Sequence, residues 1–145
     1  MGLFDFASDI GNKLFGSDDD PAEAIQHHIE DENPGVDRLE IAVENDVATV
    51  KGKAKDKSAW EKAILMAGNV FGISEVKADE LEVEDDSAPE ALYYTIEKGD
   101  TLWAIASKHL GSGAKYTEIF EANREVIKDP DLIFPGQKIR IPNAK

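Results

Sequence analysis

The residue types that carry most enzyme chemistry are sparse in this chain of 145 residues. It contains no cysteine, which excludes disulfides, zinc–thiolate sites and cysteine nucleophiles. His27 and His28 are adjacent, so on a helix they cannot share a face to bind one metal ion, and His109 stands alone near a predicted helix end. No serine lies in a Gly-x-Ser-x-Gly turn, and no pair among the 30 acidic residues stands out as flanking a substrate cleft. We therefore expect a protein that is not an enzyme.

Acidic residues are concentrated in the first part of the chain. The formal net charge is −14, and residues 1–87 carry all of that excess, whereas residues 88–145 are neutral. A chain this acidic repels phosphate backbones, so we expect no nucleic-acid partner. The change in charge along the chain indicates two modules with different roles.

The first residues do not have the pattern of an export signal. Residues 1–9 lack a basic start and carry acids among their apolar side chains. Residues 1–15 are expected to form a short amphipathic N-terminal helix, whose polar face is acidic and therefore disfavours an anionic membrane surface. No apolar run approaches the roughly 20 residues needed to cross a bilayer. We expect a cytoplasmic protein with no membrane partner.

Residues 16–84 are expected to form a small α+β domain. Apolar residues recur at helical spacing, then alternate, then return to helical spacing, which predicts the order α-β-β-α-β with helices on one face of a sheet. The first helix begins after Asp20, the hairpin turns at Asn45-Asp46, and the second helix begins at Ser58, which with Glu61 has the pattern of a capping box. A third strand is expected to be irregular at Asp79-Glu80.

Residues 85–91 lack large apolar side chains and are expected to be a linker, followed by a small βααβ domain over residues 92–142. In that domain, Asp100 or Thr101 is expected to cap the first helix. Asn123 is placed to cap backbone groups where the second helix ends, and Pro135-Gly136 predicts a turn before the last strand. The whole chain is thus expected to be an α+β protein.

Two stretches resemble known domains. Residues 94–106, which include Gly99-Asp100-Thr101-Leu102-Trp103, together with Ala122-Asn123 and residues 132–142, resemble a LysM domain. Residues 47–52 and 69–76 resemble parts of a BON domain. A BON domain followed by a LysM domain, without an export signal, is similar to a family of small cytoplasmic potassium-binding proteins of bacteria.

The resemblance implies that the chain binds K⁺ and acts as an ion sensor, with a role in the stress response. Potassium suits neutral carbonyl oxygens rather than a carboxylate cluster. Two glycine-interrupted helix ends in the acidic part can supply such oxygens, because helix C-termini present unpaired carbonyls and a partial negative charge. The expected ligands are the backbone carbonyls of Ala7, Ile10, Gly11, Asn12, Asn69, Phe71, Gly72 and Ile73.

In this interpretation one ion joins the N-terminal helix to the turn after the second helix. The protein is expected to be a monomer in which the BON and LysM domains dock more closely when K⁺ is bound. The glycines at these helix ends could instead be ordinary helix caps. A protein partner that receives the signal is not identified by the sequence.

The alternative function is glycan binding, because LysM domains commonly bind N-acetylglucosamine chains of peptidoglycan or chitin. The matching groove residues are Gly99, Asp100, Thr101, Leu102, Ile133 and Phe134. A chain without an export signal rarely meets the cell wall, so we expect the potassium function instead.

Overall fold

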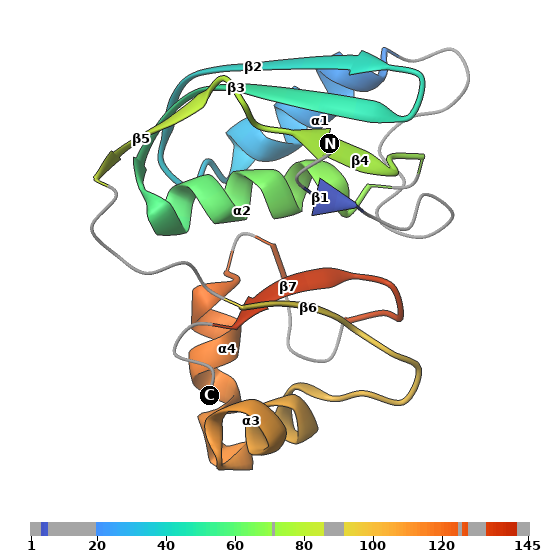
Figure 1. Cartoon of the computed structure of the whole chain (residues 1–145), viewed down its shortest axis with the longest axis vertical. Helices are drawn as coiled ribbons and strands as arrows, with labels where there is room; N and C mark the ends of the chain where they lie inside the picture. The colour runs from blue at the N-terminus through green and yellow to red at the C-terminus, as the bar shows by residue number, and fades with distance from the viewer. Residues whose placement is uncertain are drawn as a thin grey trace.

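The computed structural model describes residues 4–5, 20–70, 72–85, 92–124, 126–127 and 133–141. The described elements form two α+β domains, one above the other in Figure 1, which confirms the expected fold class. The N-terminal domain contains β1 (Phe4–Asp5), α1 (Pro21–Asp31), β2 (Val36–Glu44), β3 (Val47–Asp56), α2 (Lys57–Gly68), β4 (Glu75–Lys77) and β5 (Leu81–Asp85). The C-terminal domain contains β6 (Leu92–Thr95), α3 (Leu102–Leu110), the 3₁₀ turn η1 (Gly113–Lys115), α4 (Tyr116–Ala122) and β7 (Lys138–Ile141).

The N-terminal sheet is built around β3. Strand β2 pairs with β3 in an antiparallel hairpin that turns at Asn45, whose φ of 59° suits an asparagine. On its other side β3 pairs in parallel first with β4 and then with β5. The turn at Asp79-Glu80 separates β4 from β5, which confirms the irregularity expected there. The sheet is therefore mixed, with the order β1-β4-β3-β2 and β5 as a second neighbour of β3.

The N-terminal helix expected over residues 1–15 is wrong at Phe4 and Asp5. They are extended, and Phe4 pairs with Val76 and Asp5 with Glu75 in an antiparallel ladder. The free edge of β4 presents backbone N–H and C=O groups, and a strand pairs with them where a helix would not. The rest of the predicted helix, residues 1–3 and 6–15, lies outside the described residues, as do linker residues 86–91.

The N-cap of helix α2 lies two residues earlier than the sequence pattern predicts. This N-cap is Asp56, whose Oδ1 accepts a hydrogen bond from the Ala59 N–H at 2.8 Å. The expected capping box of Ser58 and Glu61 is wrong, because Glu61 is completely buried and pairs with Arg140, 79 residues further along the chain.

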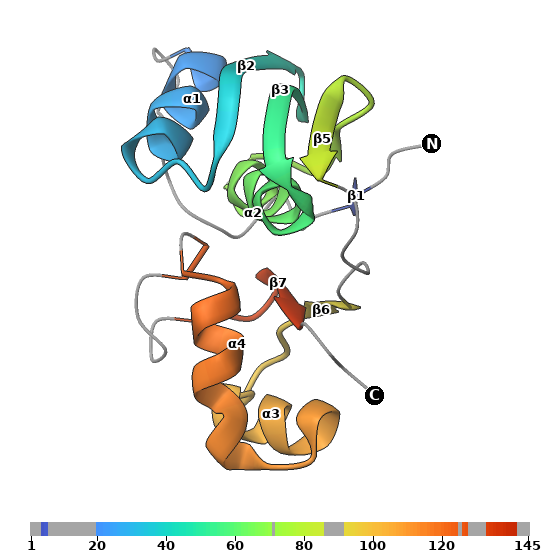
Figure 2. The ribbon, with the colours of Figure 1, turned by 90° about the vertical axis from the view of Figure 1, so that its left-hand side faces the viewer.

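Both N-terminal helices lie on one face of the sheet (Figure 2). Ile25 and Ile29 of α1 and Ile64 of α2 are fully buried. From Ala63 to Gly68 every residue of α2 is buried, so this helix has apolar contacts all round its circumference. The sheet covers one side of α2, and β7 of the C-terminal domain contacts another side (Figure 2).

A buried ion pair crosses this domain interface. The Arg140 Nε donates to Glu61 Oε1 at 2.7 Å, and the Glu61 side chain has no exposed surface. The Arg140 Nη1 also donates to the Ala122 carbonyl at 2.8 Å, so the guanidinium ties α2 to the end of α4. Because each charge is out of water, each depends on the other for its stability.

Asn123 caps the end of α4, as the sequence predicts, and also bonds β7, which the sequence does not predict. It is fully buried and stands directly after α4. Its Nδ2 donates to the carbonyls of Ile119 and Arg140, at 2.7 and 2.8 Å, and its Oδ1 accepts from the Arg140 N–H at 2.9 Å. One side chain therefore ends a helix and fixes β7 beside it.

We predict that Arg140→Met lowers the free energy of unfolding by about 3–5 kcal/mol, because the fully buried Glu61 carboxylate loses the positive charge of the guanidinium. The double variant Glu61→Leu/Arg140→Met removes both charges and is expected to recover most of that loss. Urea denaturation of the full chain measures both values. Equal losses in the single and double variants would contradict the role given to the ion pair.

Candidate functional site

Three of the predicted potassium ligands lie together in the turn between α2 and β4. Asn69 is the C-cap of α2, and Gly72 and Ile73 follow it before β4 begins. The Asn69 N–H donates to the Leu65 carbonyl at 2.9 Å, and the Ile73 N–H donates to the Val70 carbonyl at 3.1 Å. The other predicted ligands, Ala7, Ile10, Gly11, Asn12 and Phe71, lie outside the described residues.

This turn is held firmly in place. Gly72 has a φ of 101°, a left-handed conformation that side chains other than glycine's disfavour. The side chains of Val70 and Ile73 on either side of it are fully buried. Ser74 then binds the hairpin between β2 and β3, since its N–H donates to the Asp46 carbonyl at 2.8 Å and its Oγ to the Asp46 carboxylate. The turn is thus anchored at both ends.

Strand β1 lies beside the exit of the same turn. Its antiparallel register pairs Asp5 with Glu75 and Phe4 with Val76. Glu75, the partner of Asp5, is the second residue after Ile73 in the chain. The structure thus brings the start of the chain to the turn after α2.

The Asn69 side chain makes a contact that sequence reasoning did not predict. It is 4% exposed, and its Nδ2 donates to the Lys138 carbonyl at 2.7 Å while its Oδ1 accepts from the Lys138 N–H at 2.8 Å. Its partner lies in β7, 69 residues away in the chain and in the other domain. The asparagine directly after a helix was a visible signal for a cap, but nothing local indicated the distant strand.

The predicted glycan loop of the C-terminal domain is fixed by Asp100. Its Oδ2 accepts from the Tyr94 Oη and from the Glu97 N–H, the latter at 2.8 Å. Thr101 rather than Asp100 caps α3, because its Oγ1 accepts from the Ala104 N–H at 3.1 Å. Of the other predicted groove residues, Gly99 and Thr101 are exposed, Ile133 and Phe134 are half-buried, and Leu102 is buried in the core.

The hydrogen bond between Tyr94 and Asp100 shifts both pKa values. The bond from Tyr94, and then that from the Glu97 backbone, lowers the pKa of Asp100 from its usual 3.8. The ionised carboxylate therefore stabilises the folded state above pH 3.8, and that contribution is lost as the pH falls through the lowered pKa. The bond to Asp100, then burial and the nearby negative charges, raises the pKa of Tyr94 to about 12.

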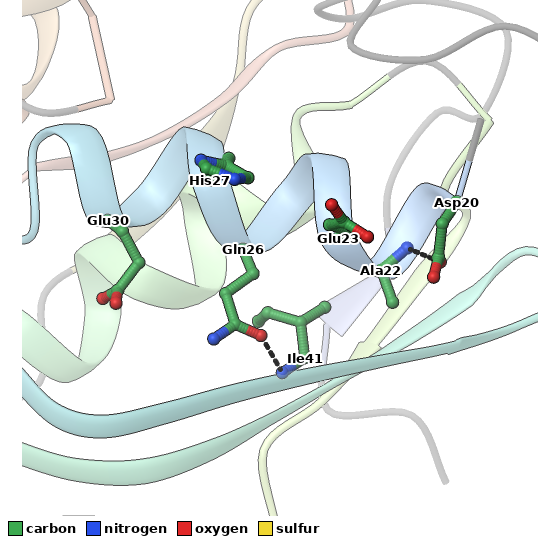
Figure 3. A pocket seen from close by; sticks show the side chains of 7 residues that line it. All are labelled: Asp20, Ala22, Glu23, Gln26, His27, Glu30 and Ile41. Atoms are coloured by element: carbon green, nitrogen blue, oxygen red, sulfur yellow. Dashed lines mark hydrogen bonds between the residues drawn. The ribbon is translucent and has the colours of Figure 1, made fainter.

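An open groove of about 460 Å³ runs between α1 and β2 (Figure 3). Its lining residues are Asp20, Ala22, Glu23, Gln26, His27, Glu30 and Ile41. The Gln26 amide is directed at the backbone of β2, where its Nε2 donates to the Leu39 carbonyl at 3.0 Å and its Oε1 faces the Ile41 N–H (Figure 3). The central polar group of the groove therefore attaches α1 to the sheet.

Within the described ranges, no group of three or more histidine, aspartate or glutamate side chains is placed to hold a metal ion. Over the same part of the chain, no helix has both the length and the apolar character that a membrane span requires.

The Tyr94–Asp100 pair predicts an unusual tyrosine titration. Of the three tyrosines, Tyr94 is expected to ionise at a pKa of about 12, and Asp100→Ala should move that step toward 10 because the hydrogen bond and the negative charge are removed. Absorbance of the phenolate against pH measures it, and Tyr94→Phe identifies the step. A wild-type step near 10 that Tyr94→Phe removes would contradict the assignment.

Comparison with known proteins agrees with the two domains. The BON domain family matches residues 17–85, and the LysM domain family matches residues 94–142. The potassium binding protein Kbp of Escherichia coli is 38% identical over 98% of this chain and 99% of its own length. An uncharacterized protein of Deinococcus radiodurans is 42% identical over 72% of this chain but only 44% of its own length. The uncharacterized protein YqbP of Bacillus subtilis is 42% identical over 39% of this chain and 29% of its own length.

The order of the two domains and the identity to the E. coli protein along nearly the whole of both chains confirm the resemblance found in the sequence. The chain belongs to the protein family of the potassium binding protein Kbp.

Proposed function

We propose that the chain binds one potassium ion through backbone carbonyls of its N-terminal half and changes its conformation when the ion binds. The observation that carries this proposal is the 38% identity to a protein named for potassium binding, over 98% of the chain. In this proposal the protein is a cytoplasmic, monomeric sensor of K⁺ with a role in the stress response. It performs no catalysis, and the protein that receives its signal is unidentified.

The geometry of the turn after α2 supports the position of the ion. The proposed ligands are the carbonyls of Asn69, Phe71, Gly72 and Ile73 on one side, and those of Ala7, Ile10, Gly11 and Asn12 on the other. Asp5 of β1 pairs with Glu75 of β4, which is the second residue after Ile73. The C-terminal end of α2 adds a partial negative charge, which favours a cation.

Glycan binding is the second candidate, because residues 94–142 match the LysM domain family. The loop from Glu97 to Thr101 is held in a defined shape by Asp100. In this alternative, Gly99, Asp100, Thr101, Leu102, Ile133 and Phe134 contact an N-acetylglucosamine chain.

Calorimetric titration of the ion-free full chain tests the proposal. We predict saturable heat with KCl and none with NaCl at the same ionic strength, because a carbonyl site of fixed size selects the larger ion. Bound K⁺ should also raise the thermal midpoint, since a ligand that binds only the folded state stabilises it. No saturable heat with either salt would contradict the proposal, and titration with chitin oligosaccharides would then test the second candidate.

Calorimetric titration of two glycine variants with KCl tests whether the potassium site lies at the turn after α2. Gly72→Ala and Gly111→Ala each place a side chain at a left-handed φ, 101° and 84°. Each should cost about 1–2 kcal/mol of stability. Only Gly72→Ala should weaken potassium binding, because Gly111 ends α3 in the other domain and a Cβ added there meets no atom within 4 Å. Equal potassium affinity in the two variants would contradict a site at the turn after α2.

A further inference from the structure

The free edge of β7 is covered by two asparagine side chains in the same manner. The opposite edge of β7 pairs with β6, where Lys138 aligns with Thr95 and Arg140 with Tyr93. On the free edge, the N–H and C=O of Lys138 bond to the Asn69 amide, and those of Arg140 bond to the Asn123 amide. All four distances lie between 2.7 and 2.9 Å. Each amide thus takes the place that the peptide group of a further strand would occupy.

The two asparagines come from different domains. Asn123 belongs to the same domain as β7, since it follows α4 directly. Asn69 belongs to the other domain and follows α2 directly. The Asn123 bonds are therefore contacts within the LysM domain, and they break when that domain unfolds. The Asn69 bonds are contacts between the two domains, and they break when the domains separate.

Asn69 also stands in the turn to which potassium is assigned above. Its carbonyl is one of the proposed ligands, and its N–H closes the last turn of α2 on Leu65. The backbone and the side chain of a residue share one Cα, so a change in the dihedral angles that aims this carbonyl also redirects the amide. Burial of the side chain, at 4% exposure, leaves little room for the amide to adjust independently.

A second contact crosses the same interface at a distance from the Asn69 bonds. Glu61 lies eight residues before Asn69 on the same helix, about 12 Å at the rise of an α-helix. Its ion pair with Arg140 holds α2 against β7 at that distance from the turn. The interface thus has one contact far from the turn and one contact within it.

We infer that Asn69 couples the turn after α2 to the LysM domain, so that potassium binding strengthens the Asn69–Lys138 contact and that contact raises potassium affinity. This inference rests on the proposed potassium function. Asn69 is a positioning residue in this scheme, because its amide fixes the orientation of the backbone that carries the ligand carbonyls. Coupling between two sites is reciprocal, so the two effects must have the same magnitude.

Amide hydrogen exchange of the full chain, followed by nuclear magnetic resonance, tests the inference directly. Exchange is compared in KCl and in NaCl at equal ionic strength. The Lys138 amide should exchange about 5- to 150-fold more slowly in KCl, the usual range of coupling between sites. The Arg140 amide is the matched control, since it makes the same type of bond on the same strand, but to Asn123 of its own domain. Its exchange should change much less.

Two variants measure the reciprocal effect. Asn69→Ala removes the contact with Lys138 and should weaken potassium binding by the same factor by which KCl slows the Lys138 amide. Asn33→Ala is the matched control, because Asn33 also bonds backbone groups through both side-chain atoms, at Gly35 and Val36, within the N-terminal domain. It should lower stability and leave potassium affinity unchanged.

The outcomes separate the inference from the function on which it rests. Absence of saturable potassium heat in the wild-type chain would overturn both. Potassium binding with equal slowing at Lys138 and Arg140, or with no slowing at Lys138, would overturn the coupling alone. So would an Asn69→Ala chain that binds potassium as tightly as the wild type does. The exchange measurement needs no variant, so it decides the question even if Asn69→Ala fails to fold.

Discussion

The structure depends on the burial of α2 between two partners. Along its second half this helix has no solvent-exposed residue, because the sheet of the N-terminal domain covers one side and β7 of the LysM domain contacts another. A helix with such surroundings fixes the relative position of everything attached to its ends. Asp56 begins it, Glu61 holds it to Arg140, and Asn69 ends it against Lys138. The interface therefore determines where the turn after α2 lies.

The turn after α2 is consequently connected both to the sheet of the N-terminal domain and to β7 of the LysM domain. On the side of the sheet it connects to β4, and β4 pairs with the first described residues of the chain, Phe4 and Asp5. Toward the LysM domain, the Asn69 side chain at this turn bonds the N–H and C=O of Lys138 on the free edge of β7. In our proposal an ion at this turn acts on both connections, since its ligands come from the chain start and from the turn itself. The LysM domain then responds to an ion that it does not itself bind.

Local sequence patterns predicted the features whose partners lie nearby in the chain. The turn at Asp79-Glu80, the hairpin at Asn45 and the capping role of Asn123 at the end of α4 all follow from signals within a few residues, and the structure confirms them. The patterns failed where a distant partner decides the conformation. Glu61 is at the spacing of a capping box, yet it bonds Arg140, and Phe4 is at the spacing of a helix, yet it pairs with Val76. The family resemblance suggested potassium, whereas the Asn69–Lys138 contact required the fold.

We infer that ion binding and domain docking are one coupled process, and small-angle X-ray scattering of the full chain decides whether they are. Profiles are recorded in KCl and in NaCl at equal ionic strength. Our account predicts a smaller radius of gyration in KCl, because the ion stabilises the form in which Asn69 holds β7. Identical profiles in the two salts, with calorimetry showing that potassium is bound, would contradict it.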